Sequence, residues 1–288
     1  MTTNAQSNKC SFSRVESIRF SDLARQRILS FKNDPFLLAD WKNAVFLHFV
    51  LSPEILRPLV PAPLELELFE EKACVSLVAL TMRQFRPFRR SSLAGWIFSP
   101  LRQQSFLNVR TYVRWRDESG ALFLWGWLSR PFGVGLPLEK GGLPCGFCDL
   151  EYDHSCDRER VAGLVKQGTT RFKYQATMGA QTEFTPCAVG SLAEFAMERY
   201  TGFFFRGTQP QIFRGWHEPW LQTPLNLKIE EDSLLGEKFP WFKEAKLAEA
   251  NFAPGFDRVW LGKAHRLEKA VPARANKRTV LSAFYEIP

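Results

Sequence analysis

Apolar and polar residues alternate with a period of two along much of this 288-residue chain, which is the pattern of half-buried β-strands. The clearest case is residues 106–116, where polar side chains fill the even positions from 108 onward. We expect further strands at 43–51, 64–69, 73–86, 121–130, 147–154, 169–178, 203–206, 210–216, 224–230 and 256–268. Many short strands with short connections predict a largely antiparallel sheet that is strongly curved or closed.

Helical signals are few and short. We expect helices at 21–29, 53–60 and 191–199. The last begins at Ser191 with Glu194 three residues later, which is the arrangement of a capping box. The sequence therefore predicts an α+β fold that is mainly antiparallel β, with a few helices packed against the sheet.

The chain contains no internal repeat and no linker that cleanly divides it. Its length fits one large domain or two small ones. We expect a single domain over 36–270, preceded by a partly ordered arm at 1–35 and followed by a tail at 271–288.

The composition is that of a folded, β-rich protein. The chain is 45% hydrophobic and 24% charged, and it carries 26 Phe, 9 Trp and 5 Tyr, which favour a large core or a ring-lined pocket. The longest apolar runs, 73–82 and 121–128, are far shorter than the roughly 20 residues that span a bilayer. No signal-peptide pattern occurs, and six cysteines are too few for a disulfide framework. We therefore expect a cytoplasmic protein with no membrane partner.

The positive charge is concentrated in one stretch. The formal net charge is +8, and no Asp or Glu occurs between Lys72 and Arg116. The excess is mostly arginine, whose planar fork suits carboxylates and phosphates. Within it, RQFRPFRR at 83–90 mixes arginines with aromatic rings, as single-strand nucleic-acid binders do. Three interpretations stay open for residues 83–102. They are a solvated loop, a loop that steers anions towards the anion site, or a binding surface for nucleic acid or another anionic surface. Nucleic acid is the less favoured partner.

The strand at 106–116 carries the most informative polar side chains. Asn108, Arg110 and Tyr112 share one face of it. If that face meets solvent, it is an ordinary outer surface. If it faces an interior cavity, Arg110 can hold a carboxylate or phosphate while Asn108 and Tyr112 orient it. Arg83 could contribute to the same anion site.

Two histidines, His48 and His217, lie among aromatic residues. A buried, hydrogen-bonded histidine is the plainer interpretation of each. Paired with a carboxylate such as Glu194, Glu198 or Glu218, either could also transfer protons. No P-loop, GxGxxG, GxSxG or HExxH motif occurs, and we expect no cofactor.

Cys145 and Cys148 form a CxxC spacing, with His154 and Cys156 close behind. A redox pair would open a helix, whereas the residues that follow Cys148 have a strand pattern. A zinc site needs converging ligands, but the two cysteines would face opposite sides of a strand. We therefore interpret them as small buried thiols and expect no metal.

Six segments together resemble a known family. They are PFLLADWKNAVFLHFVLSPEILRPLVPAPLELELFEEKACVSLVALTMRQFRP, FLNVRTYV, GLPCGF, LAEFAMERYTGFFFR, HEPW and FAPGFDRVW. Running in order from about residue 35 to 268, they resemble the YqjF-like family of uncharacterised bacterial proteins. That family is similar in fold to acetoacetate decarboxylase, which implies a cone-shaped antiparallel β-barrel with a central cavity, and suggests assembly into a homo-oligomer.

The resemblance implies little about chemistry. Acetoacetate decarboxylase forms a Schiff base through a lysine in a Pro-Lys-Lys motif, and here Cys145 stands at that place, after Pro144. Lys140 is the nearby amine that a residual lyase would use. Phe106 stands where relatives often carry Glu. Whether the chain is an enzyme therefore stays open, with a decarboxylase-like or lyase-like reaction as the class that the resemblance implies.

We thus expect a protein that binds a small anionic, carboxylate-type molecule in its central cavity. The candidate binding residues are Arg110, Asn108, Tyr112 and Arg83, and the candidate catalytic residues are His48, His217 and Lys140.

Overall fold

The computed structural model describes residues 19–32, 34–89, 103–129, 143–155, 157, 159–179 and 183–267. Lys140, Cys156, the tail at 271–288 and most of the arginine-rich segment 83–102 lie outside the described residues.

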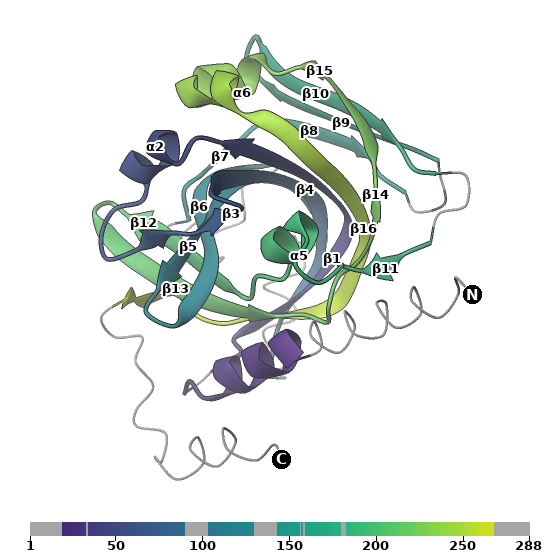
Figure 1. The fold of residues 1–288 in the computed structure, drawn as a ribbon. Coiled ribbons are helices and arrows are strands. Elements are labelled where there is room, and N and C mark those ends of the chain that lie inside the picture. Colours follow the sequence, from purple (N-terminus) through teal and green to yellow (C-terminus); the bar gives the residue numbers. More distant parts are fainter. Residues whose placement is uncertain are drawn as a thin grey trace, which may run out of the picture.

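A large sheet dominates the molecule (Figure 1). In the described residues it has 13 strands, and its main path runs β11-β14-β16-β1-β4-β5-β6-β12-β13-β17. The bounds are β1 Leu37–Leu51, β2 Glu65–Leu66, β3 Leu68–Phe69, β4 Lys72–Pro87, β5 Gln103–Trp115, β6 Glu118–Leu128, β7 Cys145–Phe147, β11 Thr185–Pro186, β12 Thr201–Arg206, β13 Gln209–Trp216, β14 Leu221–Pro224, β16 Lys246–Leu261 and β17 His265–Arg266. Its pairings are antiparallel except those of β6 with β12 and with β7.

The large sheet is strongly curved. β13 pairs with β16 as well as with β12 and β17, which connects strands far apart along the path. The sheet does not curve evenly around one axis, and we therefore do not assign it the expected cone-shaped closed barrel. The expected class, mainly antiparallel β with few helices, is confirmed.

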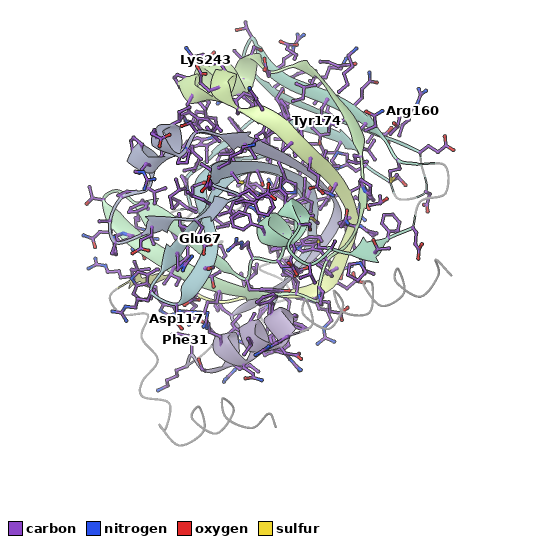
Figure 2. The ribbon with its side chains drawn as sticks, viewed as in Figure 1. Phe31, Glu67, Asp117, Arg160, Tyr174 and Lys243 are labelled. Atoms are coloured by element: carbon purple, nitrogen blue, oxygen red, sulfur yellow. The ribbon has the colours of Figure 1, made fainter. Side chains whose placement is uncertain are left out.

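A second, four-stranded antiparallel sheet covers part of the outer face of the large one. Its order is β15-β10-β9-β8, with bounds β8 Asp149–Asp153, β9 Arg160–Gln167, β10 Thr170–Thr177 and β15 Asn226–Glu231. Tyr174 lies in this small sheet, well apart from Glu67 at the pocket described below (Figure 2).

The helices are short. They comprise α2 Pro53–Leu56, η1 Arg57–Leu59, α5 Leu192–Met197, α6 Ser233–Lys238, η3 Pro240–Glu244 and a helix at residues 19–29. The hydroxyl of Ser191 accepts the Glu194 N–H at 3.1 Å, and the Glu194 carboxylate accepts the Gly190 N–H at 2.7 Å. The predicted helix start is therefore confirmed. α5 lies inside the curve of the large sheet (Figure 1). In the part of the chain that the structure describes, no helix is both long and apolar enough to cross a membrane.

The two faces of the large sheet pack against different partners. On β4, Val75, Leu77 and Ala79 join an outer core with residues of the small sheet and α6. The intervening Val78 and Leu80 join an inner core with residues of α5. Because successive side chains point to opposite faces of the sheet, this one strand contributes residues to both cores.

Several elements differ from the sequence prediction. Strand β9, helices α6 and η3 and the first half of β16 were not expected, and β1 starts earlier than predicted. β9 and the start of β16 contain fewer aromatic and β-branched residues than the predicted strands, so their sequences favour a strand only weakly. They adopt the strand conformation because they pair with neighbouring strands.

Candidate functional site

Four chemically different side chains occupy one cross-strand row of the large sheet. Glu249 of β16 is the register partner of His48 on β1. His48 in turn faces Ser76 on β4, and Ser76 faces Arg110 on β5. A carboxylate, an imidazole, a hydroxyl and a guanidinium therefore lie in sequence across four adjacent strands.

A buried chain of hydrogen bonds links the middle of this row to Tyr112. His48 Nδ1 lies 2.6 Å from Ser76 Oγ, and Ser76 Oγ lies 2.5 Å from the Tyr112 hydroxyl. All three side chains are fully buried. The chain holds Tyr112 and His48 in fixed orientations on the inner face.

Two groups in this row, Arg110 and His48, have unused hydrogen-bonding capacity. The Arg110 Nη2 donates to the Ala196 carbonyl oxygen of α5 at 2.9 Å, and its guanidinium carbon lies within 6 Å of the rings of Phe46 and Tyr112. The Nε of Arg110 and the Nε2 of His48 are buried without a hydrogen-bond partner in the part of the chain that the structure describes. Among the described residues, no carboxylate lies within ion-pair distance of this guanidinium.

The next cross-strand row adds two amides. Asn251, Phe46, Val78 and Asn108 follow one another across the same four strands. Asn108 Nδ2 donates to the Val78 carbonyl at 3.2 Å, and Asn251 Nδ2 donates to Glu249 and Gln222 at 2.8 Å. The side-chain oxygens of both asparagines are buried without a partner in the described part of the chain. Such atoms are costly unless water or a ligand binds them.

Burial keeps both candidate histidines neutral. It lowers the pKa of His48 to about 3, and the nearby positive charge of Arg110 adds to the effect. The pKa of His217 falls to about 4, again mainly through burial. A neutral imidazole of such low pKa is a weak base at neutral pH, so His48 fits a hydrogen-bonding role better than a proton-transfer role.

His217 is not a member of the cross-strand rows but lies in a cluster of rings that includes Trp220, which also packs on Phe46. The positive charge of Arg110 contributes to the lowered pKa of His217. Its ring packs on Phe256 and Tyr200 at centroid distances of 4.9 and 4.6 Å, and its Nδ1 lies 2.7 Å from the Glu218 carbonyl oxygen. These contacts match the plainer interpretation of a buried, hydrogen-bonded histidine.

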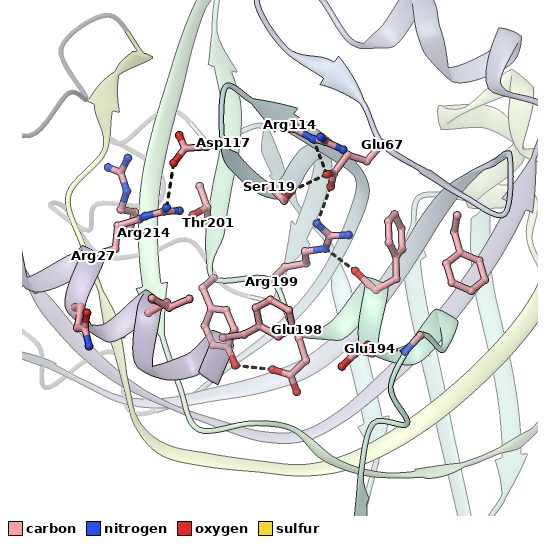
Figure 3. Close-up of a pocket in the computed structure, with 18 of the residues that line it drawn as sticks. Arg27, Glu67, Arg114, Asp117, Ser119, Glu194, Glu198, Arg199, Thr201 and Arg214 are labelled. Carbon is pink, nitrogen blue, oxygen red and sulfur yellow. Dashed lines mark hydrogen bonds and ion pairs between the residues drawn. The ribbon is translucent and has the colours of Figure 1, made fainter. Parts of the chain in front are cut away.

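A pocket of about 840 Å³ lies beside α5 (Figure 3). Its wall comes from the helix at 19–29, from β3, from the β5–β6 hairpin and from α5 with the residues that follow it. Glu67 lies in this wall and accepts hydrogen bonds from Arg114, Ser119 and Arg199 at 3.0, 2.6 and 2.7 Å.

Glu198 also lines the pocket and is an unusual carboxyl group. It accepts the Tyr200 hydroxyl at 2.5 Å and the Trp220 N–H at 2.8 Å. Despite these donors, burial raises its pKa to about 7. Glu198 therefore changes charge near neutral pH, as a proton-transfer group must.

The structure brings together three of the four predicted binding residues. Asn108, Arg110 and Tyr112 lie on the inner face and not on a solvated outer surface; their role in binding stays a prediction. Arg83 is exposed, and along β4 it is in phase with the outer-core residues rather than with the inward Ser76. Arg86, from the same arginine-rich segment, pairs with Asp40 at 2.9 Å.

The CxxC residues face different cores as expected, but both are half-buried and not buried as predicted. Cys145 packs against the inner core, whereas Cys148 packs against the outer core. The position at which the resemblance places the decarboxylase lysine thus belongs to the inner side of the sheet. Burial raises the pKa of the Cys148 thiol to about 12, which makes it a poor nucleophile.

Sequence reasoning missed Ser76, Asn251 and Glu249. Ser76 is the polar residue in the apolar run ACVSLVAL. It lies two positions before Val78, so the period-two pattern could have placed it on the inner face. Asn251 and Glu249 lie in the half of β16 that was not predicted, and no local signal connects them to His48.

Comparison with known proteins identifies the family. A family model described as an uncharacterised conserved protein, DUF2071, matches residues 38–256. The chain belongs to the DUF2071 family. This DUF2071 protein is 30% identical over 221 residues to the uncharacterised protein YqjF of Bacillus subtilis (strain 168), a match that covers 74% of the chain and 89% of YqjF. The resemblance to YqjF-like proteins is thereby confirmed.

Solved structures share the fold of the DUF2071 chain. An acetoacetate decarboxylase-like enzyme from Sphingomonas wittichii RW1 matches with a TM-score of 0.55 and 17% identity, over 81% of this chain and 94% of that one. Acetoacetate decarboxylase from Legionella pneumophila matches with a TM-score of 0.54 and 15% identity, over 80% and 87%. The enduracididine biosynthesis enzyme MppR, complexed with pyruvate, matches with a TM-score of 0.54 and 13% identity, over 83% and 91%. The chain therefore has an acetoacetate decarboxylase-like fold.

Proposed function

We propose that this DUF2071 protein binds a small carboxylate-bearing molecule on the inner face of its barrel-like large sheet, with Arg110 holding the carboxylate. The observation that carries the proposal is a guanidinium on the inner face with a buried, unpartnered Nε and no carboxylate at ion-pair distance among the described residues. Arg110 is half-buried as a residue, but its Nε is fully buried, and the cost of taking a charged group out of water is offset when an anion pairs with it. A ligand carboxylate would supply the missing partner through charge-assisted hydrogen bonds.

The neighbouring groups fit an orienting role. Asn108 and Asn251 offer unpartnered oxygens that accept hydrogen bonds from a hydroxyl, an enol or a bound water of the ligand. Tyr112 and His48 are fixed by Ser76 and give the site a rigid wall. The pyruvate complex of MppR, a protein of the same fold, supports a small oxo acid as one ligand of this class.

A lyase reaction on this scaffold would need an amine or another nucleophile beside the ligand. The matching position holds Cys145, so the chain departs from the Schiff-base arrangement that the resemblance implies. Binding is the part of the function that the geometry supports best, and Lys140 stays a candidate for covalent chemistry.

The test is calorimetric titration of pyruvate, acetoacetate and straight-chain monocarboxylates, each against its neutral amide. We expect the acids to bind and the amides to bind at least tenfold more weakly. Arg110→Ala should weaken acid binding at least tenfold, while Arg110→Lys, which keeps the charge without the fork, should fall between. Arg83→Ala is the matched control, because Arg83 is exposed on the opposite face, and it should bind as the natural chain does. Unchanged binding in a folded Arg110→Ala variant would show that the carboxylate lies elsewhere.

A further inference from the structure

We propose that the ligand is a short 2- or 3-hydroxy acid, whose carboxylate binds Arg110 and whose hydroxyl donates a hydrogen bond to the side-chain oxygen of Asn108. This inference rests on the proposed function, which places the carboxylate at Arg110. It adds the second polar group of the ligand, a hydroxyl rather than the carbonyl of an oxo acid.

Asn108 presents a buried acceptor that lacks a donor. The residue is only 3% exposed, and its Oδ1 has no hydrogen-bond partner in the described part of the chain. Its Nδ2 donates to the Val78 carbonyl oxygen at 3.2 Å. Turning the amide over would place Oδ1 against that carbonyl oxygen, so this bond fixes Oδ1 on the unpartnered side. A buried acceptor of this kind is destabilising until a donor reaches it.

The Arg110 guanidinium is held in place on the same face. Its Nη2 donates to the Ala196 carbonyl oxygen at 2.9 Å, and its central carbon lies 5.8 and 5.9 Å from the ring centroids of Phe46 and Tyr112. The buried Nε, which has no partner among the described residues, is the guanidinium nitrogen nearest to β5. A carboxylate bound there is therefore on the Asn108 side of the guanidinium.

The two side chains extend over the same part of the inner face. They are two positions apart on β5, which places them on one face of the strand with roughly 7 Å between their backbones. The Asn108 amide reaches across to Val78 of β4, and the Arg110 guanidinium reaches further, to the ring of Phe46 on β1. Both side chains thus lean from β5 in the same direction, towards β1.

The spacing of these two groups suits a small molecule. In a 2- or 3-hydroxy acid only one or two carbon atoms separate the carboxylate from the hydroxyl, so groups on adjacent same-face positions of one strand can bind both. The side chains of Val78 and Phe46, next to the pair, are apolar and only 2% and 1% exposed. They offer hydrophobic contact to the short carbon chain of the acid.

The chemistry of the site selects a hydroxyl as the second group. The carbonyl oxygen of an oxo acid accepts hydrogen bonds but cannot donate them, so it would set one acceptor against another at Asn108 Oδ1. The ammonium group of an amino acid could donate, but a second cation is unfavourable here. The charge of Arg110 already lowers the pKa of His48 and of His217, which shows that it disfavours positive charge nearby. A hydroxyl is the donor that carries no charge.

The experiment compares pairs of acids that differ only in the second group. Calorimetric titration of the full chain measures the affinity for lactate against pyruvate and for 3-hydroxybutyrate against acetoacetate, with the enantiomers of each hydroxy acid titrated separately. We expect one enantiomer of lactate or of 3-hydroxybutyrate to bind at least about tenfold more tightly than its oxo acid, because only the hydroxyl supplies the donor that Asn108 lacks. Propionate and butyrate, which lack both groups, should also bind more weakly than the preferred hydroxy acid.

Three variants locate the hydroxyl. Asn108→Leu removes the acceptor at nearly constant volume, and it should bring the affinities of the preferred hydroxy acid and its oxo acid to within about twofold of each other. Asn226→Leu is the matched control, because Asn226 is exposed on β15 of the small sheet, and it should keep the full preference. Arg110→Ala should weaken binding of both members of each pair. The comparison of acids in the natural chain needs no variant, so it decides the ligand class even if Asn108→Leu does not fold.

The outcomes separate this inference from the proposed function. If the acids bind through Arg110 but no hydroxy acid binds more tightly than its oxo acid, the hydroxyl site is wrong and the carboxylate site stands. A preference that survives in a folded Asn108→Leu variant would mean that another acceptor, such as Asn251, binds the hydroxyl, and would overturn the assignment to Asn108. If no acid of either kind binds, the proposed function fails and the hydroxyl site fails with it.

Discussion

Burial decides the charge of the ionisable residues near the interior, and it acts in opposite directions on bases and acids. It lowers the pKa of His48 to about 3 and that of His217 to about 4, because the charged form of an imidazole is the protonated one. It raises the pKa of Glu198 to about 7, because the charged form of a carboxyl is the deprotonated one. Of these three residues, the one that titrates near neutral pH is therefore the glutamate and neither of the two histidines that the sequence suggested.

Glu198 should make stability fall as the pH rises. Between about pH 4.5, the usual value of a glutamate, and about pH 7, the folded chain keeps a proton on Glu198 that the unfolded chain has released. Stability therefore falls as the pH rises through this window, and it levels off above about pH 7, where Glu198 is a buried charge in the folded chain as well. In thermal unfolding from pH 5 to 8, the Tm of the natural chain minus that of Glu198→Gln should fall by roughly 5 °C.

The control for this series is Glu218→Gln, because Glu218 is exposed. The difference between its Tm and that of the natural chain should stay constant across the same pH range. A constant difference for Glu198→Gln as well would mean that Glu198 ionises as an ordinary exposed glutamate.

Among the elements, the antiparallel pair of β1 and β16 contains a local irregularity that depends on one glycine. Gly255 has a φ of +91°, and it pairs with Lys42 beside the register shift that separates Ala39 from Trp41. A Cβ at Gly255 would collide with the Trp41 carbonyl oxygen. Only glycine combines this backbone conformation with so close an approach.

Gly255→Ala should therefore destabilise the protein by about 3 kcal/mol or more, through both the positive φ and the collision. The matched substitution Gly236→Ala, inside α6 with no atom within 4 Å of the new methyl group, should stabilise it by about 0.5–1 kcal/mol. Denaturant unfolding of both variants measures the contrast. Equal effects of the two substitutions would contradict the geometry at Gly255.

At the scale of the whole molecule, one buried carboxylate joins strands that are distant in sequence. Glu118, at the start of β6, receives two hydrogen bonds from Arg214 of β13 and one of 2.6 Å from Thr201 of β12. The side chains of Glu118 and Arg214 are only 6% and 5% exposed. The pair therefore helps to hold β6, β12 and β13 together at the edge of the pocket.

Glu118→Gln should cost about 3 kcal/mol and lower the Tm by roughly 5–10 °C, because it leaves Arg214 buried without its counter-charge. The neighbouring Asp117→Asn is the control. Asp117 also pairs with an arginine but is 87% exposed, so its loss should change stability by less than about 1 kcal/mol. Thermal unfolding of the two variants measures the difference. An equal loss of Tm in both would contradict this role of Glu118.

Local periodicity and composition were enough to predict several features of this protein. The period-two pattern of residues 106–116 predicted that Asn108, Arg110 and Tyr112 share a face, and Ser191 with Glu194 predicted the start of α5. The segments from 35 to 268 were enough to indicate the family and its fold.

Which residues share the site depends on how distant strands pair in the folded chain. His48, Ser76, Arg110 and Glu249 come from four strands that span about 200 residues, and the register between those strands places them in one row. That register follows from the packing of two cores on opposite faces of the sheet, and a shift of one residue would turn each side chain to the other face. Burial on the inner face, which makes the histidines neutral and Glu198 titratable, likewise arises only when distant segments enclose them.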